Sequence, residues 1–234
     1  MNLTKEAPTT TGFEGQSWAG RAPAIPVPWE ALGSDAGIFV MLVDATGNVV
    51  FANTAWNRLL GLSQVTGKTL IELLGKEIAA ERQQINDRVI ATKHPESILD
   101  MVGGSLLRTT RRPIQSPEDG IPSGVLVTSC VVREGMELSN IRLATYHDLG
   151  HLQALTEREF ELLHHVGKGL SSDDAATKMH RSTRTVEWHR ASLGEKLGCH
   201  NRVEIARVAI ASGITAVSVE MLLKIHRAAK PRRA

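Results

Sequence analysis

The stretch STRTVEWHR at residues 182–190 decides how the C-terminal part of this chain can fold. Ser182 is a typical helix N-cap, and the residues after it have the spacing of an amphipathic helix. Val186, Leu193 and Leu197 fall on one side of that helix, and cations, hydroxyls and an aromatic ring fall on the other. A helix of this kind can pack against its neighbours by the apolar side and enter a DNA major groove by the other.

Three further helices are expected around this one. Thr156 and Glu159 have the spacing of a capping box, and a stripe of apolar residues at helical spacing follows them. Ser172 is expected to cap a second, short helix that has acidic residues in its first turn. Asn201 and Glu204 repeat the capping-box pattern for a last helix. This end of the chain therefore predicts an all-helical unit.

Five motifs follow one another in this unit. They are LTERE at 155–159, GLSS at 169–172, RTVEWHR at 184–190, KLG at 196–198 and NRVE at 201–204. In order and spacing they resemble the LuxR-type (GerE-type) helix-turn-helix. The resemblance implies a four-helix domain whose third helix reads the major groove and whose fourth helix contributes to a dimer contact.

The resemblance also implies which side chains would meet DNA. Glu187, Trp188 and Ala191 would face the bases, where a carboxylate can accept from a cytosine amine and an apolar side chain can contact a thymine methyl. Cations and hydroxyls beside them would contact phosphates and set the register. These phosphate-side residues are Arg184, Thr185, Arg190, Lys196 and Arg202, and the full expected set adds Ser172, Arg181, Thr183 and Asn201.

Charge alone does not select a DNA-binding surface in this unit. Single cations such as Lys168 and Lys178 are usually only solvated, whereas the five cations of the expected set fall on or beside one face. The acids of the unit nearly balance its bases, so binding is expected to rely on a dimer and on helix dipoles as well. A basic tail at 217–234 either adds non-specific phosphate attraction or serves as a solubilising end.

The N-terminal half has the pattern of a mixed unit. Apolar residues at 37–43 and 49–52 predict two strands that an Asp/Gly/Asn turn joins. A helix around Trp56, Leu59 and Leu60 is expected next, capped by Asn53 or Thr54 and ended by Gly61. The further expected elements are helices at 70–74 and 76–92, strands at 97–102, 105–114 and 124–132, and a candidate strand at 142–146.

This order of two strands, a helical interlude and three more strands is similar to that of a PAS domain. The resemblance implies a five-stranded antiparallel sheet with helices across one face, and a sensory or dimerisation role. The expected fold class is therefore α+β, a PAS-like domain followed by an all-α helix-turn-helix domain. The expected parts are a flexible, proline-rich leader at 1–32, the PAS-like domain at 33–133, a linker at 134–152, the helix-turn-helix domain at 153–216 and the basic tail at 217–234.

The composition favours a soluble, cytoplasmic protein. Hydrophobic residues make up 42% and charged residues 22% of the 234 residues, as in chains that form a core. The net charge of +2 gives no overall attraction to nucleic acid, so attraction must come from local placement. Cys130 and Cys199 lack a partner motif, which fits a reducing compartment. No apolar run approaches the ~20 residues of a membrane span.

No residue pattern predicts catalysis, a metal site or a cofactor. No serine or cysteine lies in a nucleophile elbow, and no glycine pattern matches a phosphate loop. His164 and His165 are adjacent on a helix and point in different directions. His147 and His151 lie in a strand-like context beside Gly150, so neither pair predicts a shared metal ion. We expect neither an enzyme nor a bound cofactor.

The two units together predict a DNA-binding transcriptional regulator. A signal, a ligand or a partner would shift the PAS-like half and change how a homodimer presents its two helix-turn-helix units to half-sites about one DNA turn apart. The expected partners are double-stranded DNA, a second copy of the chain, and RNA polymerase or a signalling partner. Two alternatives stay open: a sigma-like factor, which would also need a helical promoter-melting domain, and an adaptor that binds only protein.

Overall fold

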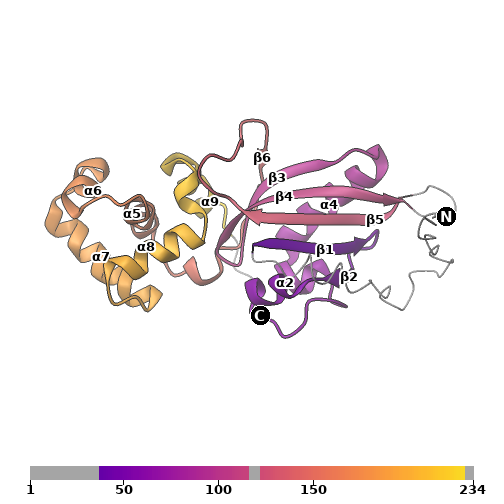
Figure 1. Cartoon of the computed structure of the whole chain (residues 1–234), viewed down its shortest axis with the longest axis horizontal. Helices are drawn as coiled ribbons and strands as arrows, with labels where there is room; N and C mark the ends of the chain where they lie inside the picture. The colour runs from indigo at the N-terminus through magenta and orange to yellow at the C-terminus, as the bar shows by residue number, and fades with distance from the viewer. Residues whose placement is uncertain (1–36, 116–121, 230–234) are drawn as a thin grey trace, which may run out of the picture.

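The computed structural model describes residues 37–115 and 122–229. A strand-rich unit and a helical unit lie end to end (Figure 1). The expected leader at 1–32 lies outside the described residues. None of the helices in the described ranges has the length and apolar composition that crossing a bilayer requires.

The N-terminal unit is built on a six-stranded sheet. Its strands are β1 (Ile38–Asp44), β2 (Val49–Ala52), β3 (Glu96–Val102), β4 (Ser105–Gln115), β5 (Pro122–Val131) and β6 (Arg142–Leu143). They lie in the order β2-β1-β5-β4-β3-β6. All pairings are antiparallel except that of β6, which runs parallel to β3. The five expected antiparallel strands are confirmed, and the candidate strand at 142–146 adds a short sixth.

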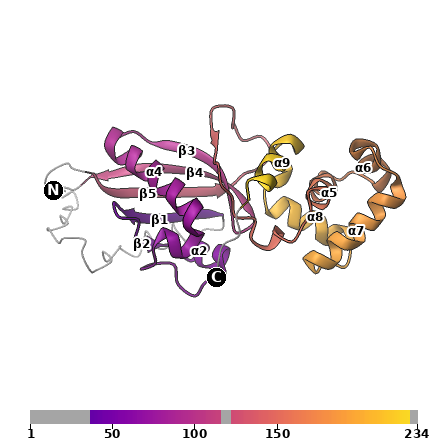
Figure 2. The same ribbon diagram turned by 180° about the vertical axis from the view of Figure 1, so that it is seen from behind.

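Three helices cover one face of this sheet (Figure 2): α2 (Thr54–Leu60), α3 (Leu70–Leu74) and α4 (Lys76–Thr92). Ile78, Ile85 and Val89 on α4 are buried in the core, as their spacing predicts. The same face of α4 also buries the polar side chains of Arg82 and Asn86, which the apolar pattern did not mark. A polar patch therefore lies inside this unit.

The start of α2 differs in detail from the expected cap. Asn53 occupies the N-cap position, but its side chain makes no capping hydrogen bond. Instead its Nδ2 donates to the carbonyl of Ile38 at 2.9 Å, and its Oδ1 accepts from the amide of Val40 at 3.3 Å. Asn53 thus ties the helix start to β1. Gly61 ends the helix in the left-handed conformation, with φ of 65°, as expected.

The helical unit contains five α-helices within the described residues. After the 3-10 turn η1 (Gly150–Leu152) they are α5 (Glu157–Gly167), α6 (Ser172–Met179), α7 (Thr183–Leu197), α8 (Arg202–Ala211) and, after η2 (Ile214–Ala216), α9 (Val219–Arg227). Helix α5 lies at the centre and packs against α7, α8 and α9. The four helices expected from the sequence are α5 to α8.

Helix α9 differs from the expected basic tail at 217–234. Residues 219–227 form a helix because apolar residues recur among the cations at helical spacing. Leu222 and Ile225 are fully buried against the core of the helical unit. The cations lie on the opposite side, so the segment is part of the fold and not a solvated end.

One hydrophobic core runs from the sheet into the helices. Leu99, Met101 and Leu106 of the strands belong to the same buried cluster as the core residues of α5 and α7. The amide of Leu106 also donates to the carbonyl of Ser212 at 2.7 Å, just after α8. Gly213 follows with φ of 75°, and a Cβ there would lie 2.7 Å from the carbonyl oxygen of Val132. The two units therefore pack closely through the start of β4.

Because α9 packs against the core, truncating a buried leucine on it should destabilise the protein far more than truncating an exposed isoleucine elsewhere. Leu222→Ala should lower the free energy of unfolding by about 3 kcal/mol because it leaves a cavity in the shared core. Ile71→Ala, at an exposed position on α3, should change it by less than about 0.5 kcal/mol. Urea denaturation followed by circular dichroism measures both. Equal losses in the two variants would contradict the docking of α9.

Candidate nucleic-acid interface

Helix α7 is sealed on one side and open on the other. Its N-cap Ser182 accepts from the amide of Thr185 at 3.2 Å, as the sequence predicts. Val186 and Leu193 are buried on the side of α7 that packs against α5 and α6, whereas Trp188 is 66% exposed. Gly194 lets the backbone approach the following turn, since a Cβ there would lie 2.9 Å from the carbonyl oxygen of Cys199.

The cap of α6 is Ser171, not Ser172 as expected from the sequence. Ser171 Oγ accepts from the amide of Asp174 at 3.1 Å, and Asp174 closes the box by accepting from Ser171. The capping box needs a polar acceptor three residues after the cap, and that spacing selects the first serine of the pair. Ser172 is the first helical residue, and its hydroxyl donates to Glu187 on α7.

Glu187, a residue expected to face the bases, is held inside a small network. Its Oε1 accepts from Ser172, and its Oε2 accepts from the guanidinium of Arg190 one turn later. The carboxylate is therefore fixed relative to both α6 and α7, and the charge of Arg190 is balanced locally. Neighbouring Trp188 stacks edge-on to His189, with ring centroids 5.0 Å apart.

The five cations of the expected set differ in how far they are engaged. Arg181 and Arg184 are exposed at the start of α7, and among the described residues neither side chain takes part in a hydrogen bond or ion pair. Arg202 donates to the carbonyl oxygens of Gly169, at 2.8 Å, and Leu170, at 2.5 Å. It therefore fastens the start of α8 to the turn before α6. Arg190 and Lys196 are paired with carboxylates.

The remaining expected residues are placed as follows. Ala191 and Thr183 are exposed on α7, and the hydroxyl of Thr183 donates to Asp173 at 2.6 Å. Thr185 is half-buried in the first turn of the same helix. Asn201 caps α8 by accepting from the amide of Glu204 at 3.0 Å. The carboxylate of Glu204 accepts from the side-chain amide of Asn201 at 2.8 Å and from the backbone amide of His200, not that of Asn201, at 2.6 Å.

Glu159 is a buried hub that the capping box alone did not reveal. Its Oε2 accepts from Lys196 Nζ at 2.7 Å and from the amide and hydroxyl of Thr156, and its Oε1 accepts from Ser192 Oγ at 2.7 Å. Burial by itself would raise the pKa of Glu159, but the hydrogen bonds from Lys196, Thr156 and Ser192 lower it to about 2. The ionised carboxylate therefore locks the back of α7 to the start of α5.

The histidine pairs take structural positions. His164 is buried on α5, where its Nε2 donates to the carbonyl of Val217 at 3.1 Å. Its ring lies edge-on to that of His165, with centroids 5.3 Å apart. His147 is buried in the linker, and its Nδ1 accepts from the amide of Met101 at 3.3 Å. Among the described residues no group of three or more histidine, cysteine or acidic side chains could hold a metal ion.

Two family models match this chain in the same order as its two units. The model described as "Bacterial regulatory proteins, luxR family" matches residues 153–209, and that of the PAS fold matches residues 29–128. The chain joins a PAS domain to a luxR-family regulatory domain. Both resemblances expected from the sequence are thereby confirmed, as is the mixed α+β fold class.

Curated relatives match this chain over stretches of about 60 residues. The transcriptional regulatory protein UhpA of Escherichia coli (strain K12) is 40% identical over 58 residues, which are 25% of this chain and 30% of UhpA. The nitrate/nitrite response regulator protein homolog of Haemophilus influenzae is 35% identical over 66 residues, 28% of this chain and 32% of that protein. The chain thus spans about a third of the length of these two relatives, which are named as regulators.

Among solved structures, some similar chains match most of the length of this one. The dimer of VqmA from Vibrio cholerae in the absence of target DNA is 24% identical, with a TM-score of 0.43, and the match covers 85% of this chain and 93% of that one. A complex of Vibrio VqmA with a ligand and DNA is 25% identical, with a TM-score of 0.46 and coverage of 85% and 92%.

The Glu159 hub predicts a pH-dependent loss of stability. Glu159→Gln should lower the free energy of unfolding at pH 7 by about 2 kcal/mol, because it removes hydrogen bonds to a charged group. The pKa of Glu159 is about 2 in the folded chain against an ordinary 4.5. Its contribution is therefore complete above pH 4.5 and is lost as the pH falls towards 2. Urea titrations at several pH values should show that the difference in the free energy of unfolding between the wild type and Glu159→Gln decreases over this range.

The control for this experiment is Glu195→Gln, which neutralises an exposed acid on α7, the helix that contacts Glu159 through Ser192 and Lys196. It should change the free energy of unfolding by less than about 0.5 kcal/mol at any pH. If the difference in the free energy of unfolding between Glu159→Gln and the wild type stayed constant from pH 7 to pH 2, the Glu159 carboxylate would not be ionised in the folded protein.

Proposed function

We propose that this protein is a transcriptional regulator that binds double-stranded DNA through the open side of α7, under the control of its PAS domain. The observation that carries the proposal is the placement of Trp188 and Arg184 on a solvent-facing helix surface while Val186 and Leu193 seal its back. Tryptophan is enriched where proteins meet their partners, because its ring combines a large apolar body with a polar donor. A DNA groove provides such a partner.

The cations support this assignment by their position. Arg184 lies in the first turn of α7 and Arg181 directly precedes its N-cap, at the end of the helix where the dipole adds partial positive charge. They are also the two cations of the expected set that have no internal partner among the described residues. We therefore assign the strongest phosphate contacts to them, and we assign structural roles to Lys196 and Arg202. Glu187, Trp188 and Ala191 would face the bases.

We propose that the protein acts as a homodimer. One recognition helix reads only a few base pairs, so specific binding generally needs two copies on neighbouring half-sites. Val203 and Ile210 are seven residues apart on α8 and are 62% and 50% exposed, which makes one apolar side of that helix available to a second copy. Such a dimer would act in the cytoplasm, without enzymatic activity, by presenting RNA polymerase or a signalling partner to a promoter.

The proposed parts are a PAS domain at 33–133, a linker at 134–152 and a luxR-family domain at 153–216, as expected from the sequence, with α9 at 219–227 packed onto the last of these. Control of one domain by the other requires a physical connection between them. The linker supplies it, since it leaves the sheet at β6 and enters α5.

Two residues of the PAS domain, Glu81 and Arg82, hydrogen-bond to this linker, and Asp100 forms an ion pair with Arg82; we call these three residues the linker clasp. Glu81 accepts from the amides of Thr145, at 2.8 Å, and Tyr146, at 3.2 Å. Arg82 donates to the carbonyl of Tyr146 at 3.0 Å and forms a buried ion pair with Asp100 at 3.1 Å. Burial raises the pKa of Glu81, but the amide of Thr145 and the charge of Arg82 together lower it to about 2.

DNA binding by the α7 surface is tested by titrating fluorescently labelled DNA with the protein at several salt concentrations. Selected DNA is obtained by binding the wild-type protein to a random-sequence library. Arg184→Ala should weaken binding to all sequences and reduce the slope of log affinity against log salt by about 1 per copy, because one phosphate contact is lost. Trp188→Ala should instead change which sequence the library yields.

The matched control is Lys76→Ala, which removes an exposed cation from the PAS domain. It should leave affinity and salt slope unchanged. If the wild-type chain binds no DNA from the library while its fold is intact, the helical unit is a protein-binding adaptor and the proposal is wrong.

The second prediction concerns the linker clasp. Glu81→Gln should speed hydrogen exchange at the amides of Thr145 and Tyr146 by about tenfold or more, since a neutral acceptor binds them less strongly than a carboxylate. Amides in the centre of β5 should exchange as in the wild type. Asp87→Asn, an acid-to-amide change at an exposed position on the same helix, is the control. Unchanged exchange at the linker in Glu81→Gln would refute the clasp.

A further inference from the structure

The surface of α7 carries an ion pair whose two members stand one helical turn apart. Nη2 of Arg190 donates to Oε2 of Glu187. The side chain of Glu187 is 40% exposed and that of Arg190 is 38% exposed, so solvent reaches both members. The other carboxylate oxygen, Oε1, accepts from the hydroxyl of Ser172 on α6. The pair is therefore held by two helices and still has an open edge.

Both members of the pair keep unused hydrogen-bonding positions. A carboxylate has about four lone-pair positions, and the described residues occupy two of those of Glu187. A guanidinium has five N–H donors, and one of those of Arg190 is directed at a described residue. Its second Nη2 proton and its Nη1 protons form a fork that fits two neighbouring acceptors. The edge of the pair thus presents two donors followed by an acceptor.

This row of groups matches one kind of base-pair edge in the major groove. A C·G pair shows the N7 and O6 acceptors of guanine and then the N4 donor of cytosine. A T·A pair shows an acceptor, the N6 donor of adenine and another acceptor, so the second donor of the fork would meet a donor. Such a mismatch leaves polar groups unpaired in the interface, which costs free energy. The row of two donors and an acceptor therefore selects C·G.

The ion pair also removes an electrostatic obstacle to a carboxylate in a DNA groove. A lone glutamate would be repelled by the phosphates on both sides of the groove. Because Arg190 balances the charge of Glu187, the pair as a whole has no net charge. Its two members therefore enter the groove together more easily than the carboxylate alone.

We propose that Glu187 and Arg190 act together as a specificity-determining pair that reads one C·G base pair in each half-site. The guanidinium donates to N7 and O6 of guanine, and the carboxylate accepts from N4 of cytosine. Ser172 is a positioning residue, because it acts on the base through the carboxylate that it holds. The inference rests on the proposed binding of DNA by α7. It gives Arg190 a base contact in place of the phosphate contact expected from the sequence.

Base analogues in the DNA that the wild-type chain selects test this contact atom by atom. 7-Deazaguanine lacks N7 but still pairs with cytosine, and at the contacted pair of one half-site it should weaken binding by about tenfold. Inosine at the same place is the matched control, because it keeps N7 and O6 and loses only an amino group in the minor groove. Its binding should stay within about threefold of that of the unmodified DNA. Titration of fluorescently labelled DNA measures both.

Arg190→Lys separates base reading from simple charge balance. Lysine keeps a positive charge beside Glu187 but lacks the fork. The preference for C·G over T·A at the contacted pair should therefore fall by about tenfold, while the slope of log affinity against log salt stays unchanged. Glu187→Gln should lower the same preference, because it replaces the carboxylate by a group that also donates. Glu195→Gln, the same change at an exposed position later on α7, is the control and should keep the preference.

Arg190→Met, which removes the donors, links the residue to the base atom. With this variant, 7-deazaguanine should no longer weaken binding beyond the effect of the variant itself. Circular dichroism checks that each variant is folded, and the base-analogue titrations need only the wild-type chain.

Three results would overturn the proposal while DNA binding by the chain still stood. The selected half-site has no position that requires C·G; 7-deazaguanine weakens binding at none of its C·G pairs; or Arg190→Lys keeps the full preference, so that Arg190 only balances charge. A wild-type chain that selects no DNA from the library would overturn both this proposal and the proposed function.

Discussion

The candidate DNA-binding surface depends on the hydrogen bonds and the ion pair that the buried carboxylate of Glu159 makes with α7. A recognition helix is useful only if one side is fixed, because a helix that rolls or slides cannot present the same side chains to successive base pairs. Apolar packing of Val186 and Leu193 holds α7 against its neighbours but gives it little rotational register. The ionic and hydroxyl bonds from Lys196 and Ser192 to Glu159 supply that register. The same carboxylate caps α5, so one group sets the positions of two helices.

This contact also explains how much of the site could be predicted from the sequence. The caps at Thr156, Ser182 and Asn201 and the exposed Trp188 follow local spacing rules, and the structure has all of them. Pairing between Lys196 and Glu159 could not be predicted, because it joins residues far apart in sequence through packing that no periodicity encodes. The cap at Ser172 was wrong by one residue, since adjacent serines are nearly equivalent as local signals and only the distance to Asp174 separates them.

In the fold too, the features that could not be predicted from the sequence are those that depend on contacts between residues far apart in the chain. Strand and helix limits around α4 and β4 follow from hydrophobic spacing and glycine turns, and they agree closely with the structure. Buried Arg82 was not foreseen because a cation in a polar helix normally faces water. Helix α9 was not foreseen because the segment is rich in cations and was therefore interpreted as a solvated tail. The helical spacing of Leu222 and Ile225, which are buried, is what makes it part of the core.

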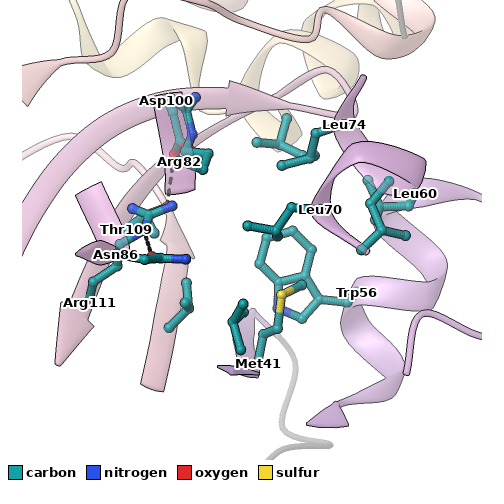
Figure 3. A pocket seen from close by; sticks show the side chains of 14 residues that line it. Met41, Trp56, Leu60, Leu70, Leu74, Arg82, Asn86, Asp100, Thr109 and Arg111 are labelled. Carbon is teal, nitrogen blue, oxygen red and sulfur yellow. Dashed lines mark hydrogen bonds and ion pairs between the residues drawn. The ribbon is translucent and has the colours of Figure 1, made fainter. Parts of the chain in front are cut away.

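Buried charge in the PAS domain has a cost that a purely structural role explains poorly. Removing ionised groups from water is expensive, and packed apolar residues could fill the same space with equal or greater stability. Two arginines, Arg82 and Arg111, and Asp100 nevertheless line one small cavity between the sheet and its helices (Figure 3). One of them, Arg82, also hydrogen-bonds to the linker that leads to the luxR-family domain, and Asp100 pairs with Arg82. Electrostatic interactions are strong and long-ranged in such an interior, so a change of charge or of hydrogen bonding in the cavity acts on the linker over a few ångströms. An apolar core of the same shape would offer no such coupling. The buried ion pair of Arg82 and Asp100 therefore connects the polar interior of the PAS domain to the linker, because Arg82 also donates to the carbonyl of Tyr146.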